Sequence, residues 1–173
     1  MVRAVETAAP VAEALDLPVI GLPEAHEEGG VFALVPGTDD LEARPGAGRS
    51  ALLRLCPRLV LPPAVTEAGW YFQPVEDRAA SWPRAQRVVA ELAERYGGGD
   101  RVVALVSHGF FTQMLVRALL DWEPDLSTPV LDPWLQVSNT GTFCLWSPGP
   151  SGERARLEWA NRTDHLEPDL VTD

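Results

Sequence analysis

A continuous apolar run followed directly by a helical pattern is the feature that most constrains how this sequence can fold. The run is "VVALV" at residues 102–106, and "SHG" separates it from an amphipathic pattern over residues 110–120. An unbroken apolar run of this length is typical of a strand buried on both faces of a parallel sheet. The sequence therefore predicts a strand, a turn and a helix in succession, which is the building unit of an α/β fold.

The start of the chain predicts a helix over residues 4–16, followed by a short buried strand at residues 18–22. Pro10 constrains this helix, because an interior proline loses a hydrogen bond and clashes with the preceding turn. Either Thr7 caps a helix that holds Pro10 in its first turn, or a kinked helix runs in from upstream. The apolar face of the helix is expected to consist of Ala4, Ala8, Val11, Ala12 and Leu15.

The middle of the chain alternates irregular and helical patterns. Residues 29–50 are rich in Gly, Pro and Asp and predict a long loop, and residues 51–56 predict a short helix. Residues 61–77 are irregular and contain the aromatic run Trp70, Tyr71 and Phe72, which together with the long loop is expected to shape a pocket. Residues 81–96 predict an amphipathic helix with Ser81 as its N-cap and Gly97 to Gly99 as its end.

The last part of the chain predicts a hairpin of two strands, at residues 137–146 and 154–162, joined by the turn "SPGPSGE". Helices and strands that alternate and end in a hairpin predict an α/β sandwich with a mixed sheet. We expect a single domain over residues 1–165 and a polar tail at residues 166–173.

Composition narrows the class of partner. The net charge of −11 argues against nucleic acid or an anionic membrane, because the field of the whole protein repels polyanions. A small phosphorylated substrate needs only a local positive pocket. The sequence has no apolar run as long as a membrane span and no signal peptide, and Cys56 and Cys144 are expected to be reduced, so we expect a cytoplasmic protein.

His108 lies where the predicted strand ends and the next helix begins, at the rim where α/β proteins bind ligands. Gly109 lets a ligand approach the backbone, and the start of the helix offers free N–H groups to an anion. From the residues alone, His108 is a phosphoryl ligand, a base, a metal ligand, or a histidine satisfied by hydrogen bonds at a strand end.

A second cluster, "LPEAHEEGGVF", follows the predicted strand at residues 18–22. A carboxylic acid at this rim can protonate a leaving group, and the alternative is a solvated acidic loop. The acidic candidates are Glu24, Glu27 and Glu28, with His26 among them. We predict no metal site, because there is no HExxH motif and no close spacing of ligands. A glycine-rich phosphate loop and a GxSxG motif are also absent from the sequence.

Four segments, taken in order, resemble the histidine phosphatase superfamily, which has the phosphoglycerate mutase-like fold. "RAVETAAPVAEAL", which begins at Arg3, is similar to a family helix of the pattern R-A-x-x-T-A-x-x-x-A. "HEEGG" resembles the family's Glu-bearing loop, "VVALVSHGFFTQMLVRALL" its strand and helix around S-H-G, and "SNTGTFCLW" its hairpin. The resemblance covers about residues 2–163, and the shared order makes it more specific than any one motif.

The resemblance implies a three-layer α/β/α sandwich with a mostly parallel mixed sheet. It implies that Arg3 and His108 bind phosphoryl oxygens and that Glu27 donates a proton, with Glu24 and Glu28 as alternatives. The other substrate-binding residues would be His26, Ser107 and Gly109. In the family, a neutral imidazole attacks phosphorus to form a phosphohistidine, the acid protonates the departing alkoxide, and water then releases phosphate without a metal or cofactor.

The sequence departs from the family at the nucleophile. In the family this histidine lies in an R-H-G motif on the first strand, whereas the histidines here are only His26, His108 and His165, and none stands in R-H-G. We therefore expect Met1 to be an internal residue of a longer protein, with the first strands missing and the chain inactive or nearly so. Because the family's first strand neighbours the S-H-G strand, residues 102–106 are expected to lose backbone partners.

The sequence-based hypothesis is a phosphatase that hydrolyses a phosphomonoester. Its alternatives are mutase-type phosphoryl transfer between hydroxyls, a non-catalytic member that binds a phosphorylated ligand through Arg3 and His108, and an inert structural domain. The expected partner is a small phosphorylated substrate, and the sequence predicts no oligomeric state.

Overall fold

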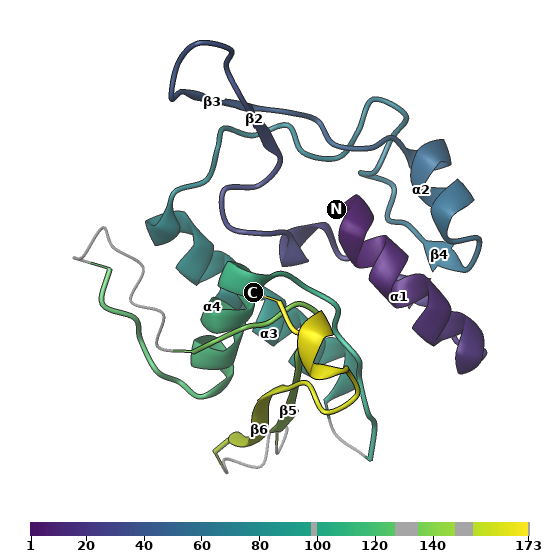
Figure 1. Ribbon diagram of the computed structural model, residues 1–173, viewed down its shortest axis with the longest axis vertical. Coiled ribbons are helices and arrows are strands. Elements are labelled where there is room, and N and C mark those ends of the chain that lie inside the picture. The colour runs from purple at the N-terminus through teal and green to yellow at the C-terminus, as the bar shows by residue number, and fades with distance from the viewer. Residues whose placement is uncertain (98–99, 127–134, 148–153, 173) are drawn as a thin grey trace. The chain divides into compact units, whose positions relative to one another are not determined.

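The computed structural model describes residues 1–97, 100–126, 135–147 and 154–172, and the chain divides into two compact units (Figure 1). The first unit contains Met1–Asp77 and Val106–His108. The second contains Arg78–Leu105 and the chain from Gly109 onward. Helices and short strands of both pairing directions occur, so the protein is of the α/β class. The expectation of one domain over residues 1–165 stays a prediction.

The first unit begins with helix α1 (Val2–Ala14), and Pro10 lies inside this helix. Thr7 does not cap it, because Thr7 stands in mid-helix and its Oγ1 donates to the carbonyl oxygen of Arg3 at 3.0 Å. Of the two alternatives, the one in which Thr7 caps the helix is therefore wrong. The helix tolerates Pro10 because the carbonyl left without a donor belongs to the exposed Glu6, where water can bind it.

The face that α1 buries is only in part the one predicted, since Ala12 is buried as expected. Val5 and Ala9 pack against the core of the first unit, whereas Val11 and Leu15 are 47% and 60% exposed. The buried core residues are Leu52, Cys56, Leu59 and Val65. Two neighbouring stripes of α1 are apolar, and the packing of the helix against α2 (Arg49–Leu55), rather than the periodicity alone, decides which one is covered.

Two strand pairs complete the first unit. β1 (Val19–Ile20) confirms a strand within residues 18–22, and it pairs in parallel with β4 (Leu59–Val60). The strand is not buried as expected, because Ile20 is 45% exposed. β2 (Phe32–Leu34) and β3 (Leu41–Ala43) form an antiparallel hairpin where the sequence predicted only a loop. Gly37, with φ of +80°, lies in the connection and gives the backbone a conformation that other residues rarely adopt.

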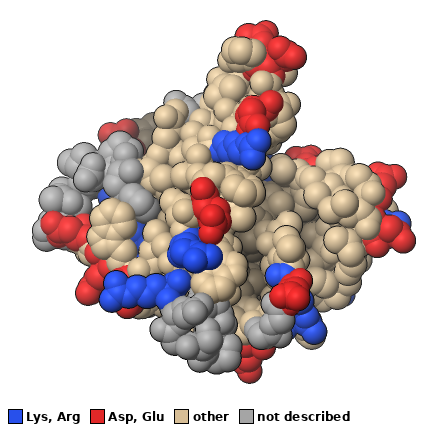
Figure 2. Space-filling view, turned by 90° about the horizontal axis from the view of Figure 1, so that it is seen from below, with Lys and Arg blue, Asp and Glu red and all other residues tan. Residues whose placement is uncertain are grey.

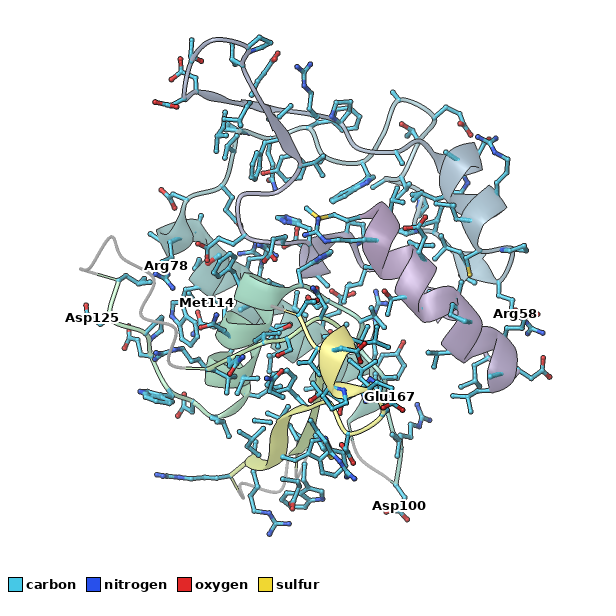
Figure 3. The ribbon with its side chains drawn as sticks, in the orientation of Figure 1. Arg58, Arg78, Asp100, Met114, Asp125 and Glu167 are labelled. Carbon is cyan, nitrogen blue, oxygen red and sulfur yellow. The ribbon has the colours of Figure 1, made fainter. Side chains whose placement is uncertain are left out.

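The second unit begins with α3 (Arg78–Tyr96), whose first turn is marked by Arg78 in Figure 3. The helix starts three residues before the predicted N-cap, and Ser81 lies inside it with its Oγ donating to the carbonyl of Arg78 at 2.8 Å. The prediction of Ser81 as N-cap is therefore wrong. The predicted end at Gly97 is confirmed, since its N–H donates to Ala93 O at 2.8 Å, and residues 98–99 lie outside the described residues.

The apolar run at residues 102–106 is not a strand. Val102 is 98% exposed and Leu105 is 38% exposed, and the segment has no regular secondary structure. A strand buried on both faces requires a hydrogen-bonded neighbour and layers that cover it. Among the described residues no strand pairs with this segment, so its apolar composition does not lead to burial.

The helix predicted after "SHG" is confirmed as α4 (Gly109–Leu119), and it packs against α3. Phe111 on α4 is fully buried, and the guanidinium of the buried Arg84 lies 3.7 Å from the centre of its ring. A cation over an aromatic face at this distance is attracted by the ring quadrupole. Met114, which is labelled on α4 in Figure 3, is also buried.

The predicted C-terminal hairpin is confirmed as β5 (Thr142–Trp146) paired antiparallel with β6 (Arg156–Arg162). Most of the predicted turn, residues 148–153, lies outside the described residues. The chain then forms the 3₁₀ helix η3 (Pro168–Leu170), and the N–H of Asn139 donates to Thr172 O at 2.7 Å. Strands in the described ranges form three two-stranded sheets, and the three-layer sandwich stays a prediction.

Arginine and acidic side chains lie next to one another on the face drawn in Figure 2. Ion pairs join Arg58 to Asp16 at 2.8 Å and Arg162 to Asp164 at 2.6 Å. Such exposed pairs contribute little to stability. Within the described parts of the chain, no helix is both long enough and apolar enough to cross a bilayer.

Candidate active site

Arg3 and His108 form the centre of the candidate site, and both belong to the first unit. The Nε–H of Arg3 donates to Nδ1 of His108 at 3.1 Å. His108 is buried, with 6% of its surface exposed, whereas 65% of the Arg3 side chain is exposed. Because a guanidinium can only donate, Nδ1 of His108 is the acceptor, and a neutral ring carries its proton on Nε2. The exposed guanidinium of Arg3 is thus the part of this pair that a ligand from solution can reach.

Glu27 is the acidic residue that contacts this pair. Its Oε2 lies 3.9 Å from Nη2 of Arg3, and its side chain is only 16% exposed. The N–H of Glu28 donates to the other carboxylate oxygen at 2.9 Å, which fixes the orientation of the carboxyl group. The structure thus brings together Arg3, Glu27 and His108, the residues that the sequence singled out from three separate segments.

Ser107 holds the histidine segment in place. Its Oγ donates to the carbonyl oxygen of Ala25 at 3.1 Å, and Ala25 belongs to the 3₁₀ helix η1 (Pro23–Ala25). The hydrogen bond ties the residue before His108 to the segment that leads into Glu27. Gly109 follows His108 in the chain as the first residue of α4, and a Cβ built on it meets no atom within 4 Å. The substrate-binding roles of Ser107 and Gly109 stay predictions.

His26 lies between the acidic residue and the aromatic run. It is 3% exposed, and its Nδ1–H donates to the carbonyl oxygen of Glu27 at 2.7 Å. Its ring stands edge-on to Tyr71 with centroids 5.2 Å apart, and it is tilted against Trp70 at 5.9 Å. His26 therefore belongs to an aromatic cluster as well as to residues 26–30, which we call the Glu27 loop.

The backbone of the Glu27 loop is held by Tyr71. The buried hydroxyl of Tyr71 lies 3.3 Å from Gly29 O and donates to Pro74 O at 2.7 Å. Gly30, with φ of +78°, lies so close to the Tyr71 ring that a Cβ there would collide with it. The pattern "HEEGG" thus requires glycine for a close approach as well as for a turn.

A pocket of about 260 Å³ opens beside His26 in the first unit, and we call it the aromatic pocket. It is lined by Pro23, Glu24, His26, Trp70, Tyr71, Phe72 and Gln73. All three residues of the aromatic run line this pocket, and its role in binding substrate stays a prediction. No sequence pattern indicated Gln73, and Pro23 was marked only as the residue before Glu24.

The loop at residues 29–50 contacts the aromatic run that lines this pocket. The N–H groups of Trp70 and Tyr71 donate to Pro45 O at 2.8 and 3.1 Å, and a Cβ built at Gly46 would stand 2.6 Å from Nε1 of Trp70. None of the residues that line the aromatic pocket comes from this loop. Its contribution is to hold the aromatic run in place.

No group of three or more His, Cys, Asp or Glu that could hold a metal ion occurs among the residues that the structure describes. His165, the third histidine, lies elsewhere in the chain, where its exposed ring is 3.4 Å from Oγ1 of Thr140.

The comparisons with known proteins give one match. The family model described as histidine phosphatase superfamily (branch 1) matches residues 1–133 of the chain. No curated protein and no solved structure matches the sequence.

Proposed function

Because the chain belongs to the histidine phosphatase superfamily, we propose that it serves the hydrolysis of a small phosphomonoester through a phosphohistidine. The observation that carries this proposal is the 3.1 Å hydrogen bond from Arg3 to His108. It places a guanidinium beside an imidazole whose Nε2 carries the proton, and charged and neutral N–H donors of this kind bind phosphoryl oxygens. The family's three-layer sandwich is part of the proposal.

Glu27 is the proposed proton donor. It is the candidate acid that contacts Arg3, at 3.9 Å, whereas Glu24 lines the aromatic pocket. The contact is long, so a phosphoryl group that binds Arg3 can replace Glu27 as partner of the guanidinium. The carboxyl group then holds a proton beside the bond that breaks and transfers it to the departing alkoxide.

The nucleophilic histidine of the family lies in an R-H-G motif, and this motif does not occur in the 173 residues. In the proposed reaction an imidazole nitrogen bonds to phosphorus while the bond to the leaving-group oxygen breaks, and Glu27 protonates that oxygen. Water then attacks phosphorus, and the P–N bond breaks to release phosphate. We therefore expect this chain by itself to bind phosphate without efficient turnover.

The proposal involves a small phosphorylated substrate and no metal or cofactor. Cys56 and Cys144 are both free, as is usual for cysteines in the reducing cytoplasm, and we propose that location.

Titration with inorganic phosphate tests the proposal on the full chain. We expect Arg3→Ala and His108→Asn each to weaken phosphate binding by about tenfold or more, because each removes a donor to a charged oxygen. Arg58→Ala is the matched control, since Arg58 pairs with Asp16 in the same unit and takes no part in the site. Equal phosphate affinity in Arg3→Ala and Arg58→Ala would refute the proposal. Arg3 is exposed enough that its loss should leave the fold intact.

A non-catalytic phosphate-binding role is the second candidate, and the absence of R-H-G from the sequence favours it. The two functions differ in whether the protein turns over a phosphomonoester. Turnover of an aryl phosphate that depends on Glu27 excludes the non-catalytic role, whereas phosphate binding with no turnover in any form of the protein supports it.

A further inference from the structure

We propose that the aromatic pocket binds the leaving group of the phosphomonoester and selects a flat ring that carries no negative charge. This inference rests on the proposed function, because it assumes that the phosphoryl group binds at Arg3 and His108.

The position of Glu27 leads to the pocket. A general acid must reach the leaving-group oxygen, so the leaving group extends from the phosphoryl group past Glu27. The Glu27 carboxylate lies 3.9 Å from Arg3, and the backbone carbonyl oxygen of Glu27 accepts the 2.7 Å hydrogen bond from His26. His26 lines the aromatic pocket. The pocket therefore begins at the residue before Glu27 in the chain, and we assign the leaving group to it on this ground.

The walls of the pocket suit an aromatic ring. Trp70 and Tyr71 stand nearly perpendicular to each other, at 77° with centroids 5.8 Å apart, and His26 adds a third ring. Aromatic rings pack favourably edge to face or offset, at centroid distances that this cluster already shows. A cavity of about 150 Å³ can hold a benzene molecule, so the 260 Å³ here suit one ring with small substituents.

Phe72 supplies a driving force for this ligand. It lines the pocket and is nonetheless 67% exposed. A ligand ring that covers Phe72 removes apolar surface of both partners from water, which is favourable in proportion to the area buried. An aliphatic, hydroxyl-rich leaving group covers the same surface with polar atoms and gains less.

The charge of the pocket argues against a second anionic group on the substrate. Its seven lining residues include Glu24 and no arginine. A carboxylate or a second phosphate in the pocket would lie beside the acidic side chain of Glu24, in a protein with a net charge of −11, and like charges repel each other. The side-chain amide of Gln73 instead offers a donor and an acceptor to the polar edge of a neutral or cationic ring.

The test compares three probes by calorimetric titration of the full chain: inorganic phosphate, glycerol phosphate and phenyl phosphate. We expect phenyl phosphate to bind about tenfold more tightly than glycerol phosphate, because aromatic contacts add to the burial of the ring. Phe72→Ala should reduce this preference to within about threefold, Phe72→Tyr should retain it, and neither should change the affinity for inorganic phosphate. Leu34→Ala is the control, since Leu34 is 64% exposed in the same unit and lies outside the pocket.

A fourth probe, 4-carboxyphenyl phosphate, tests the charge argument. It should bind more weakly than phenyl phosphate, and Glu24→Gln should narrow that difference. If inorganic phosphate binds through Arg3 but phenyl and glycerol phosphate bind equally well, the leaving-group inference is wrong and the proposed function stands. If inorganic phosphate shows no Arg3-dependent binding, the proposed function fails and this inference fails with it.

Discussion

Arg3 and His108 are 105 positions apart in the sequence, and the guanidinium of the first donates a 3.1 Å hydrogen bond to Nδ1 of the second. His26 shows the opposite arrangement, because its Nδ1 faces the carbonyl oxygen of Glu27 at 2.7 Å and must donate. The two histidines are thus held in opposite tautomers, each by a partner from this chain. In the neutral rings, His108 offers an Nε2–H donor, whereas His26 has its lone pair on Nε2.

The tautomer of His108 should depend on Arg3. In Arg3→Ala the donor to Nδ1 is lost, so we expect the neutral His108 ring to populate both tautomers, while His26 keeps its proton on Nδ1. Nitrogen chemical shifts of the two rings, measured by NMR above the pH at which they protonate, report this directly. His26 is the internal control. An unchanged His108 spectrum in the variant would show that Arg3 does not set the tautomer.

Gly30 should be far less tolerant of alanine than Gly37. Both have positive φ, +78° and +80°, so each substitution costs about 1–2 kcal/mol of backbone strain. At Gly30 the added Cβ also collides with the Tyr71 ring, whereas at Gly37 it meets no atom within 4 Å. We expect Gly30→Ala to lose about 1–3 kcal/mol more than Gly37→Ala in denaturant unfolding. Equal losses would contradict the close approach of Gly30 to Tyr71.

Glu67 should make the stability of α2 sensitive to acid. The Ser50 hydroxyl, at 2.6 Å, and the Ser50 N–H, at 3.1 Å, hold the pKa of Glu67 below its ordinary value of 4.5. A lowered pKa stabilises the folded state above pH 4.5, and this contribution is lost as the pH falls through the folded-state pKa. We expect Glu67→Gln and Ser50→Ala to flatten this part of the stability profile, as followed by thermal unfolding against pH. A profile unchanged in both variants would contradict this role.

The sequence predicted local elements well where one helix or hairpin carries its own signals. α4 follows the "SHG" turn as expected, and the hairpin of β5 and β6 is marked by two runs and a turn. The start of α3 was predicted wrongly at Ser81. Serine is a favoured capping residue, but here it lies inside a helix that begins at Arg78. The strand prediction at Val102 also failed, because an apolar run indicates a strand only when other parts of the fold supply its neighbours.

The candidate site was accessible from sequence only through the order of several motifs. Arg3 by itself reads as a surface charge, and its proximity to Glu27 and His108 is a tertiary relationship. The aromatic run was visible at residues 70–72, but its contact with His26 was not. That contact depends on the backbone of Pro45, which binds the N–H groups of Trp70 and Tyr71, and no local pattern encodes such a bond.

Gly109 allows the predicted phosphate contact to be separated from its role in the fold. It is the first residue of α4, and a Cβ there meets no atom within 4 Å. Because alanine favours helices, Gly109→Ala should leave the free energy of unfolding unchanged or raise it by about a few tenths of a kcal/mol. If phosphate binds the backbone N–H groups at this point, the added methyl group should weaken phosphate binding by about threefold or more. The methyl group would keep the phosphoryl oxygens away from the N–H donors. Phe110→Ala, at a 43% exposed neighbouring position, is the control. Thermal unfolding and phosphate titration of both variants measure the two effects separately, and wild-type phosphate affinity in Gly109→Ala would remove Gly109 from the substrate-binding residues.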